Sequence, residues 1–322
     1  MGVRYQPVEE LSMRASWSRA FQLPFPSFLF GTWNDGVAQY FHLFDPYDPD
    51  GADDVRVPYT YTWHNTDLEP EFSDTRSFSV RWEPKFLDGL LIETDYSTVD
   101  FQNRVEHSGS LIHNHLEIAF KIPEIIERNA RGDITKINFK LLNVAETRNT
   151  LASARVSYKF GFLRFGKFES EIQYSRTLED FKKYTNDTPL FSDLGTQKTG
   201  DRYQTHLSLF WERKNIRGNL FVRYRPGYLN DEAHVCKPGQ VGVGRCGAAW
   251  DYISLDVGSL TIVDATVSYR FKNYVELNLA AKNVFDRDAP NTVRDGLPYD
   301  PTRWDARGRV ISLSLTTKLL GK

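Results

Sequence analysis

Few residues in this chain of 322 have the types and the spacing that catalysis or metal binding requires. The sequence contains no Gly-x-Ser-x-Gly, no His-Glu-x-x-His and no phosphate-binding loop. If residues 113 to 115 are a strand, His113 and His115 share one face and could ligate a metal, although a solvated loop strand carries the same pair. We therefore expect a protein that is not an enzyme and that holds no cofactor.

Two loops hold other candidate ligands. The run Asp48-x-Asp50-Gly51 begins like a calcium loop but lacks the remaining ligands of an EF-hand, so a solvated acidic loop is the simpler interpretation. Cys236 and Cys246 lie in a glycine-rich stretch and could form a disulfide or remain two free thiols. A disulfide would indicate an oxidising compartment. The absence of a second cysteine pair or a nearby histidine pair argues against zinc.

The composition indicates that these residues lie on or between β-strands. Aromatic residues make up 14% of the chain, with 22 Phe, 16 Tyr and 7 Trp, and aromatic residues are enriched in strands. No run approaches the roughly 18–20 apolar residues of a membrane helix. The net charge of −2 gives no basic signature, so we expect no nucleic-acid partner.

The strand segments have one apolar face and one polar face. Val275, Leu277 and Leu279 alternate with Glu276 and Asn278, and successive side chains on a strand point to opposite faces. About eleven segments read as strands: Val3–Pro7, Leu11–Ser18, Arg76–Glu83, Leu90–Gln102, Leu151–Phe162, Phe168–Leu178, Asp201–Glu212, Arg217–Pro226, Leu260–Phe271, Asn273–Asn283 and Arg309–Leu319. Their polar faces mix both charges, as in Arg14, Glu169, Glu171, Gln173, Asp264, Arg270, Glu276, Lys282 and Lys318.

The connections alternate between a few residues and about 20–50 residues, which is the pattern of a bacterial outer-membrane barrel with short turns on one side and long loops on the other. In the long loops, the aromatic stretch from Phe21 to Phe44 is equally consistent with a ligand-catching surface and with packing against a plug or a neighbouring loop. In the loop from 103 to 150 we expect a short helix at Pro123 to Asn129 and a strand-like segment at Ile134 to Leu142.

Four stretches, in order, resemble the C-terminal half of a TonB-dependent outer-membrane receptor. Residues 11–24 are similar to a family strand, residues 65–71 to the Asn-Pro-x-Leu-x-Pro-Glu signature, residues 281–287 to the Asn-Leu-Phe-Asp element, and residues 308–319 to the last strand. Thr66 departs from the pattern, and so does the terminus, which lacks the usual final aromatic residue. The matching positions are Asn65, Leu68, Pro70, Glu71, Asn283, Phe285, Asp286, Gly308 and Arg309.

The resemblance implies an antiparallel transmembrane β-barrel segment over residues 1–322, with about eleven strands of a barrel of 22 and without the plug. It implies a Gram-negative outer membrane, lipid as a partner, and a missing N-terminal barrel and plug through which a TonB complex would act. The intact protein would take up a scarce small-molecule or metal-chelate nutrient of the siderophore-iron, cobalamin or saccharide class. The segment alone would be an inactive fragment.

The first residues support the same expectation. Residues 1–7 contain no apolar segment of a signal peptide, so either the protein is cytoplasmic or residues are missing before Met1, and we favour the second. Single-chain bacterial barrels have an even number of strands, and open sheet edges in lipid cost several kcal/mol per unpaired backbone group. Eleven strands therefore indicate a fragment of a larger barrel, unless the count is off by one. The alternatives are a free-standing porin-like channel of about 12 strands and, least favoured, a soluble β-sandwich binding module.

Overall fold

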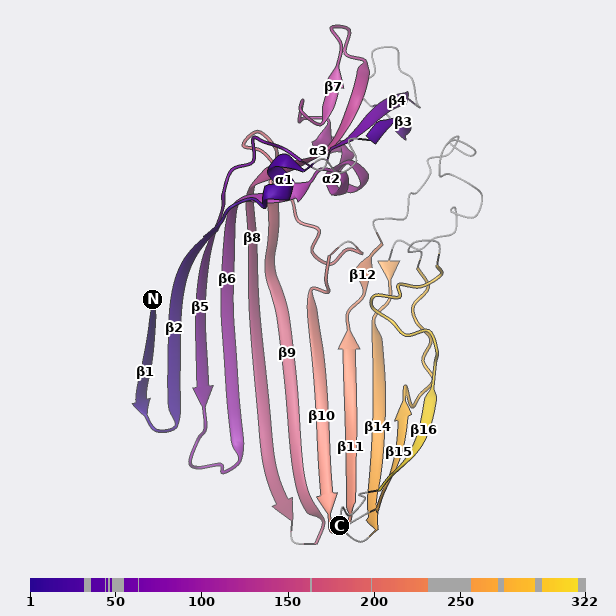
Figure 1. Ribbon diagram of the computed structural model, residues 1–322. Coiled ribbons are helices and arrows are strands. Elements are labelled where there is room, and N and C mark those ends of the chain that lie inside the picture. Colours follow the sequence, from indigo (N-terminus) through magenta and orange to yellow (C-terminus); the bar gives the residue numbers. More distant parts are fainter. Residues whose placement is uncertain are drawn as a thin grey trace, which may run out of the picture.

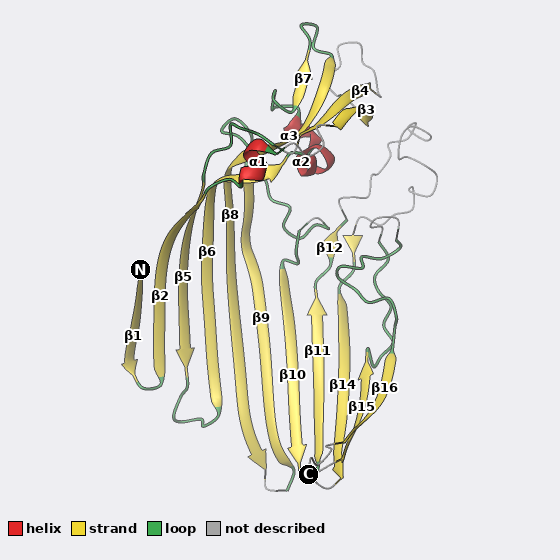
Figure 2. Ribbon diagram, in the orientation of Figure 1, coloured by secondary structure: helices red, strands yellow, loops and turns green. Residues whose placement is uncertain are grey.

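The structure is a computed structural model that describes residues 1–31, 36–43, 45, 47, 55–62, 64–162, 164–197, 199–230, 256–271, 275–292 and 297–317. Long strands make up most of it, and the helices are short (Figure 2). Of the helices in these ranges, none combines the length and apolar character needed to cross a membrane.

One continuous antiparallel meander forms the body of the protein, in which each strand pairs with the next one along the path (Figure 1). The expected all-β class is confirmed, and each expected wall strand overlaps an observed one. In path order the strands are β1 (Gly2–Val8), β2 (Leu11–Gln22), β5 (Glu71–Trp82), β6 (Leu90–His107), β8 (Ile134–Phe162), β9 (Gly166–Lys183), β10 (Tyr203–Arg213), β11 (Ile216–Arg225), β14 (Leu260–Phe271), β15 (Val275–Lys282) and β16 (Val310–Thr317).

Short turns connect the strands at one end of the sheet and long loops connect them at the other end (Figure 1). The turns require special backbone geometry. Gly166 begins β9 with φ of 101°, and a Cβ there would lie 2.2 Å from the carbonyl oxygen of Glu212 on the neighbouring hairpin. Only glycine fits such a position. As expected from the sequence, the connections alternate between short and long, with the short turns at one end of the sheet and the long loops at the other.

One face of the sheet is apolar across many strands. Ile92, Val156, Ile172, Leu207 and Val222 are register partners on five consecutive strands and form a single row. Partners directly opposite share a face, so the row is continuous. No element of the described chain covers it, and residues such as Ile172 (44%) and Leu207 (38%) stay exposed. A face of this kind needs an apolar medium or another apolar surface.

Aromatic rings border the apolar rows at both ends. Near the long loops the rings of Tyr174 and Tyr203 lie 5.9 Å apart. Near the short turns Phe160 stacks on Phe168 at 5.2 Å, and Phe168 is the register partner of Trp211. Along β10, Tyr203 and Trp211 are separated by eight residues, or about 26 Å at roughly 3.3 Å per residue. Counted inclusively, the nine residues from Tyr203 to Trp211 fit the roughly 9–11 residues of a tilted transmembrane strand.

The opposite face is polar. The side chains of Glu93 and Glu171 are 23% and 20% exposed, and those of their partners Arg81 and Arg155 are 52% and 45% exposed. The interior of an outer-membrane barrel is polar, so the polar face corresponds to the inner face of the curved sheet.

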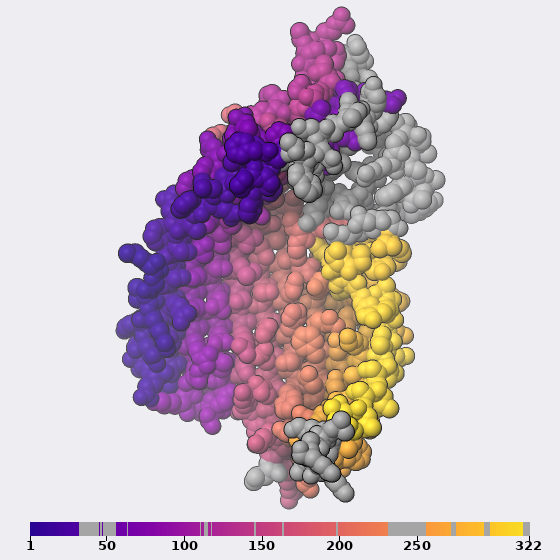
Figure 3. Space-filling view, viewed as in Figure 1, coloured from indigo at the N-terminus to yellow at the C-terminus, as the bar shows by residue number. Residues whose placement is uncertain are grey.

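The sheet is open along two margins. In the described residues β1 pairs only with β2, and β16 pairs only with β15. The space-filling view places the indigo N-terminal strands and the yellow C-terminal strands at opposite sides of the sheet (Figure 3).

A separate apical domain stands on the long-loop end of the sheet (Figure 1). It contains β3 (Gly36–Leu43), β4 (Val55–Thr62), α2 (Gly109–Asn114), α3 (Leu116–Ala119), β7 (Ile126–Arg128) and residues 134–144 of β8. β4 pairs in parallel with β8, and β7 pairs with β8 on its other edge. The remaining elements are α1 (Pro26–Phe30) and the two-residue strands β12 (Tyr228–Leu229) and β13 (Asp256–Val257).

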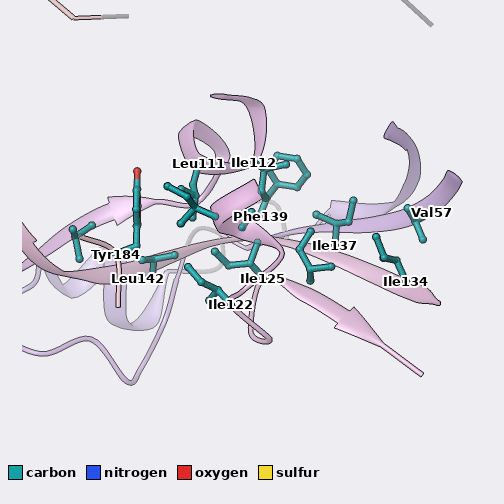
Figure 4. Close-up of a cluster of buried hydrophobic side chains, with 14 residues drawn as sticks. Val57, Leu111, Ile112, Ile122, Ile125, Ile134, Ile137, Phe139, Leu142 and Tyr184 are labelled. Carbon is teal, nitrogen blue, oxygen red and sulfur yellow. The ribbon is translucent and has the colours of Figure 1, made fainter. Parts of the chain in front are cut away.

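The apical domain contains the hydrophobic core cluster of the described residues (Figure 4). Leu111, Ile125 and Ile137 are fully buried, and Phe139 is 2% exposed. Burial of a side chain of this size stabilises a fold by roughly 1.5–3 kcal/mol. The apical domain is therefore stabilised by its own hydrophobic core, separate from the apolar face of the sheet.

Two expectations for this region are wrong. His113 lies in helix α2 and His115 separates α2 from α3, so the two residues do not share the face of a strand. The expected helix at 123–129 is replaced by β7, because Ile126 is buried and pairs with Ile137 of β8. The expected strand-like segment at 134–142 is the beginning of β8.

Candidate functional site

Three outer loops meet at one buried arginine. Arg303 donates from one guanidinium nitrogen to Asp201 Oδ1 at 2.8 Å, and its Nε lies 3.4 Å from Asp300 Oδ2. The guanidinium also lies 3.8 Å from the ring centroid of Tyr228. Side-chain exposure is 6% for Arg303, 2% for Asp201 and 0% for Asp300. We call Arg303, Asp201, Asp300 and Tyr228 the rim hub.

A second buried contact joins the same loops. The Asn230 side-chain amide donates to Thr292 Oγ1 at 2.7 Å, and Thr292 Oγ1 donates to Gln197 Oε1 at 3.1 Å. Buried polar groups cost free energy unless they are hydrogen-bonded, so this network fixes where the three loops approach one another. The loops after β9, β11 and β15 are consequently held as one unit at the outer rim.

The rim also contacts the apical domain. His115 Nε2 lies 2.9 Å from Asp193 Oδ2, and the His115 ring lies 4.5 Å from the ring of Phe191. Asp193 and Phe191 belong to the loop after β9, which the rim hub also holds. His115 therefore joins the apical domain to the rim.

The polar face carries a run of ion pairs across adjacent strands, which we call the charge ladder: Arg81, Glu93, Arg155 and Glu171. Arg81 donates to Glu93 at 2.6 Å, and Arg155 donates to Glu93 at 3.2 Å and to Glu171 at 2.7 Å. The four residues lie on β5, β6, β8 and β9 in turn. Charges of alternating sign across a sheet attract each other, so the ladder supports strand pairing on a wet face.

Other polar-face residues expected from the sequence are also paired. Asp264 accepts from Arg223 at 2.8 Å, and Glu276 lies 3.6 Å from Arg270. Glu169 lies 3.4 Å from Lys159. These groups line a hydrated inner surface of mixed charge.

The first set of family positions anchors the start of β5. The Asn65 side-chain amide donates to the Leu141 carbonyl at 2.9 Å, and Glu71 accepts from the Val105 amide at 3.0 Å. Leu68 is 8% exposed, and Pro70 directly precedes β5. The motif lies where β8 passes from the sheet into the apical domain.

The second set of family positions forms one turn structure at the outer end of the last two strands. Asn283 has φ of 50°, and its backbone N–H donates to Asp264 Oδ1 at 2.8 Å. Asp286 accepts from the Arg309 amide at 2.7 Å. A Cβ on Gly308, which has φ of 66°, would lie 2.9 Å from Asp286 Oδ1. Residues 283–286 and 308–309 therefore come together across the loop, while Phe285 remains 67% exposed.

Several candidate residues lie outside the described ranges: Cys236, Cys246, Asp48, Asp50, Gly51 and Lys318. In the part of the chain that the structure describes, no cluster of three or more His, Cys, Asp or Glu side chains could hold a metal ion. Phe21, Phe25 and Phe30 of the aromatic stretch are 70%, 55% and 72% exposed.

One acidic side chain of the apical region has a shifted pKa. Burial alone would raise the pKa of Asp45, but hydrogen bonds from Arg128 and from the Tyr47 amide, with the Arg128 charge, lower it below 3.8. Both Arg128 terminal nitrogens donate to Asp45, at 2.7 and 2.9 Å. The Arg128 guanidinium also lies 5.4 Å from the ring centroid of Phe120.

Sequence reasoning did not identify the rim hub or the helices of the apical domain. Asp300 and Arg303 carried a usable signal, because an acidic residue followed by Pro and, three residues on, by a cation is typical of a turn with an internal ion pair. Nothing in the sequence indicated that Asp201, about a hundred residues earlier, would reach the same arginine. The helices α2 and α3, with six and four residues, are too short to give a helical period in the sequence.

Comparisons with known proteins agree with this architecture. A mutant of the ferric enterobactin receptor of Pseudomonas aeruginosa, in complex with enterobactin, matches with a TM-score of 0.62 and 14% identity, covering 98% of this chain and 40% of that one. The siderophore receptor PirA of Acinetobacter baumannii matches with a TM-score of 0.59 and 12% identity, covering 98% and 40%. The copper transporter OprC matches with a TM-score of 0.53 and 13% identity, covering 98% and 38%.

At these identities the solved structures show a shared fold, and this chain spans about 40% of the length of the first of them. A search of curated protein sequences finds no match. The sequence model of the family described as TonB dependent receptor-like, beta-barrel, matches residues 1–284. The chain therefore belongs to the TonB-dependent receptor-like β-barrel family.

Proposed function

We propose that this chain forms part of the wall and the outer rim of a receptor in the outer membrane of a Gram-negative bacterium. The receptor takes up a scarce small-molecule or metal-chelate nutrient, of the siderophore-iron, cobalamin or saccharide class. An inner-membrane TonB complex supplies the energy through a plug domain. Similar solved structures include siderophore receptors and a copper transporter, which supports a substrate of this kind.

The observation that carries the proposal is the division of one sheet into two environments. The apolar face is bordered by aromatic rings at both ends, and the inner face bears the charge ladder. The loops on one end fold into the rim hub and the apical domain, where a solute from outside would first make contact. A membrane wall with a structured outer mouth has these properties.

We also propose that the sheet functions as one part of a larger closed barrel. In lipid, each unpaired backbone N–H or C=O group costs several kcal/mol, so the free edges of β1 and β16 need partner strands. The chain on its own is then inactive in transport. Energy coupling resides in the plug, which no described element of this chain resembles.

The two alternatives have less support. A porin-like channel of about 12 strands requires its first and last strands to pair, and in the described residues β1 pairs only with β2 and β16 only with β15. A soluble sandwich requires the apolar face to be covered by a second sheet, and Leu313 and Leu315 on that face are 69% and 63% exposed. We propose no catalytic activity.

The test is uptake by living cells. Deleting the gene that encodes this chain should abolish accumulation, in the periplasm, of one class among ferric siderophores, cobalamin and saccharides at nanomolar external concentration. Deleting the inner-membrane TonB protein in the parent strain should produce the same loss. Uptake that continues without the TonB protein, and that rises linearly with concentration, would instead identify a passive channel.

A further inference from the structure

Two arginines face each other at the free margin of the sheet. Arg4 of β1 and Arg14 of β2 are direct register partners, so both side chains lie on one face. On the same strands, Tyr5 pairs with Met13 on the opposite, apolar face. Arg4 and Arg14 therefore belong to the polar face that carries the charge ladder. Like charges directly opposite each other destabilise a strand pair.

Along the charge ladder, like charges do not face each other, because residues of opposite charge alternate across the strands. In the charge ladder each arginine lies between, or beside, carboxylates of the neighbouring strands, as Arg155 does with Glu93 and Glu171. Arg81 on β5 extends the ladder to Ser12 on β2, its register partner. The Arg4 Nε donates to Ser12 Oγ at 3.1 Å, so Arg4 continues the same line on β1.

The ladder ends at Arg4 without a carboxylate. Among the described residues neither Arg4 nor Arg14 makes an ion pair, and the hydrogen bonds of Arg4 go to the neutral side chains of Ser12 and Gln6. The other edge of β1 is not paired with any described strand. Both cations thus lie next to the open margin, where a further strand would add its side chains to the polar face.

The opposite margin of this chain does not supply the missing charge. The side chains of β16 on the polar face are Ser312, Ser314 and Thr316, which are register partners of Ala280, Asn278 and Glu276. No Asp or Glu occurs from residue 309 to the end of the sequence. If β16 of this chain or of a second copy were to pair with β1, no acidic side chain would lie beside Arg4.

We propose that the β1 edge is completed by a strand of different sequence that places an aspartate or glutamate on the polar face beside Arg4. The carboxylate neutralises the Arg4 and Arg14 pair and continues the alternation of the charge ladder. The charge also fixes the register of the added strand, because a slip by one residue moves the carboxylate to the apolar face. This inference rests on the proposal that further strands close the sheet.

A charge reversal tests the sign of the effect. In the full protein, in native outer membranes, Arg4→Glu and Arg4→Gln are compared by urea titration, with the fraction that keeps its folded mobility on gels as the readout. If a carboxylate lies beside Arg4, its repulsion offsets the attraction between the introduced glutamate and Arg14. Arg4→Glu then gives a ratio of folded to unfolded protein no higher than Arg4→Gln does, instead of the rise of about 1.5- to 5-fold that pairing with Arg14 alone would give. If none is present, the introduced carboxylate pairs with Arg14 and the ratio rises, which overturns the proposal.

A matched control verifies that the assay detects such pairs. Ser12 lies between Arg4 and Arg81 on the polar face. Ser12→Glu should therefore raise the folded ratio by a similar factor relative to Ser12→Gln, whatever lies beyond β1.

Cross-linking identifies the partner. In Arg4→Lys protein, a carbodiimide joins the introduced amine directly to a carboxylate in contact, and mass spectrometry reads the linked peptide. The proposal predicts a link to an Asp or Glu within an alternating strand segment of another sequence. Links only to Glu9 or Glu10, or no link, would refute it. Tyr5→Lys, on the apolar face, should give no such link.

The outcomes separate this inference from the proposed function. If uptake depends on the TonB protein but the charge reversal stabilises the fold, the receptor assignment remains and the carboxylate partner is wrong. If uptake is passive and Arg4→Lys gives no link to another strand, the closure by further strands fails as well.

Discussion

Replacing Leu207 by arginine distinguishes a lipid-facing wall from a soluble sheet. Leu207 lies on β10 midway between Tyr203 and Trp211, which border the apolar band, and its register partners are Ile172 and Val222. An arginine at the middle of a lipid-facing band costs about 2–4 kcal/mol. At about 1.4 kcal/mol per factor of ten, the ratio of folded to unfolded protein should fall roughly 30- to 700-fold.

Ser208→Arg is the matched control, because the next residue on the strand points to the polar face. Ser208 is the register partner of Glu171, so the new cation gains a carboxylate neighbour and the change should cost less than about 1 kcal/mol. Both variants add one positive charge to the same strand. A difference between them therefore reports the environment of each face.

The assay is urea titration of the assembled protein in outer membranes, followed by the gel mobility of unheated samples. In a soluble sheet Leu207, which is 38% exposed, would tolerate arginine to within about 0.5 kcal/mol, as surface positions generally do. Equal midpoints for Leu207→Arg and Ser208→Arg would thus refute the assignment of the apolar face to lipid.

Two further predictions concern the outer parts. Asp45 has its pKa lowered below 3.8, so its pair with Arg128 contributes stability above that pH, and this contribution is lost as the pH falls below 3.8 towards the pKa of the folded state. Asp45→Asn should destabilise the apical domain by about 3 kcal/mol at pH 7, because it leaves Arg128 without its anion. The same change should remove the acid dependence of stability. Hydrogen exchange of the backbone amides of Ile125 and Ile137 measures both effects. Asp305→Asn, at an exposed carboxyl whose pKa is lowered to about 2 by Arg307, should leave these amides unchanged. Arg303→Ala should leave Asp201 and Asp300 buried without their main cation, which should destabilise the rim by about 3–5 kcal/mol. Limited proteolysis should then cut residues 184–202 and 283–292 at least tenfold faster. Arg307→Ala, at an exposed ion pair, should leave these cleavage rates unchanged.

The wall of the barrel could be predicted from the sequence because its signals are local. Alternation of apolar and polar residues with period two identifies a strand such as β15 wherever its partners lie, and loop lengths give the direction of each connection. The expected ranges and the observed strands consequently overlap along the whole path. Strand ends differed more. β6 continues to His107 because it keeps pairing with β8 beyond the apolar band. β8 begins at Ile134 because its first residues pair with β7 and β4.

The apical domain and the rim hub could not be predicted in the same way, since both depend on contacts between distant segments. β4 pairs in parallel with β8 at Tyr59 and Ile137, and no local pattern in either segment specifies that partner. Arg303 and Asp201 are likewise a hundred residues apart. The helices α2 and α3 are six and four residues long, and segments this short carry no helical period in the sequence.

The family positions acquire a physical meaning from their contacts. Asp286 holds the Arg309 amide, and Gly308 lets the chain pass close to that carboxylate, so the end of β15 and the start of β16 form a single junction. Asn65 and Glu71 join the start of β5 to β8 and β6 in a similar way. Both sets fix where a long outer loop returns to the wall. The positions that match the family motifs thus lie at loop-to-strand junctions.

The two parts of the protein draw their stability from different sources, and this has a consequence for function. The apical domain buries its own core, including Leu111, Ile125 and Phe139, and does not need lipid to do so. The sheet has no such core, because Leu207 and its row meet whatever lies outside. If the chain functions as proposed, a solute at the outer mouth meets a preformed apical domain, which is joined to the rim through His115 and Asp193 and to the wall through β8.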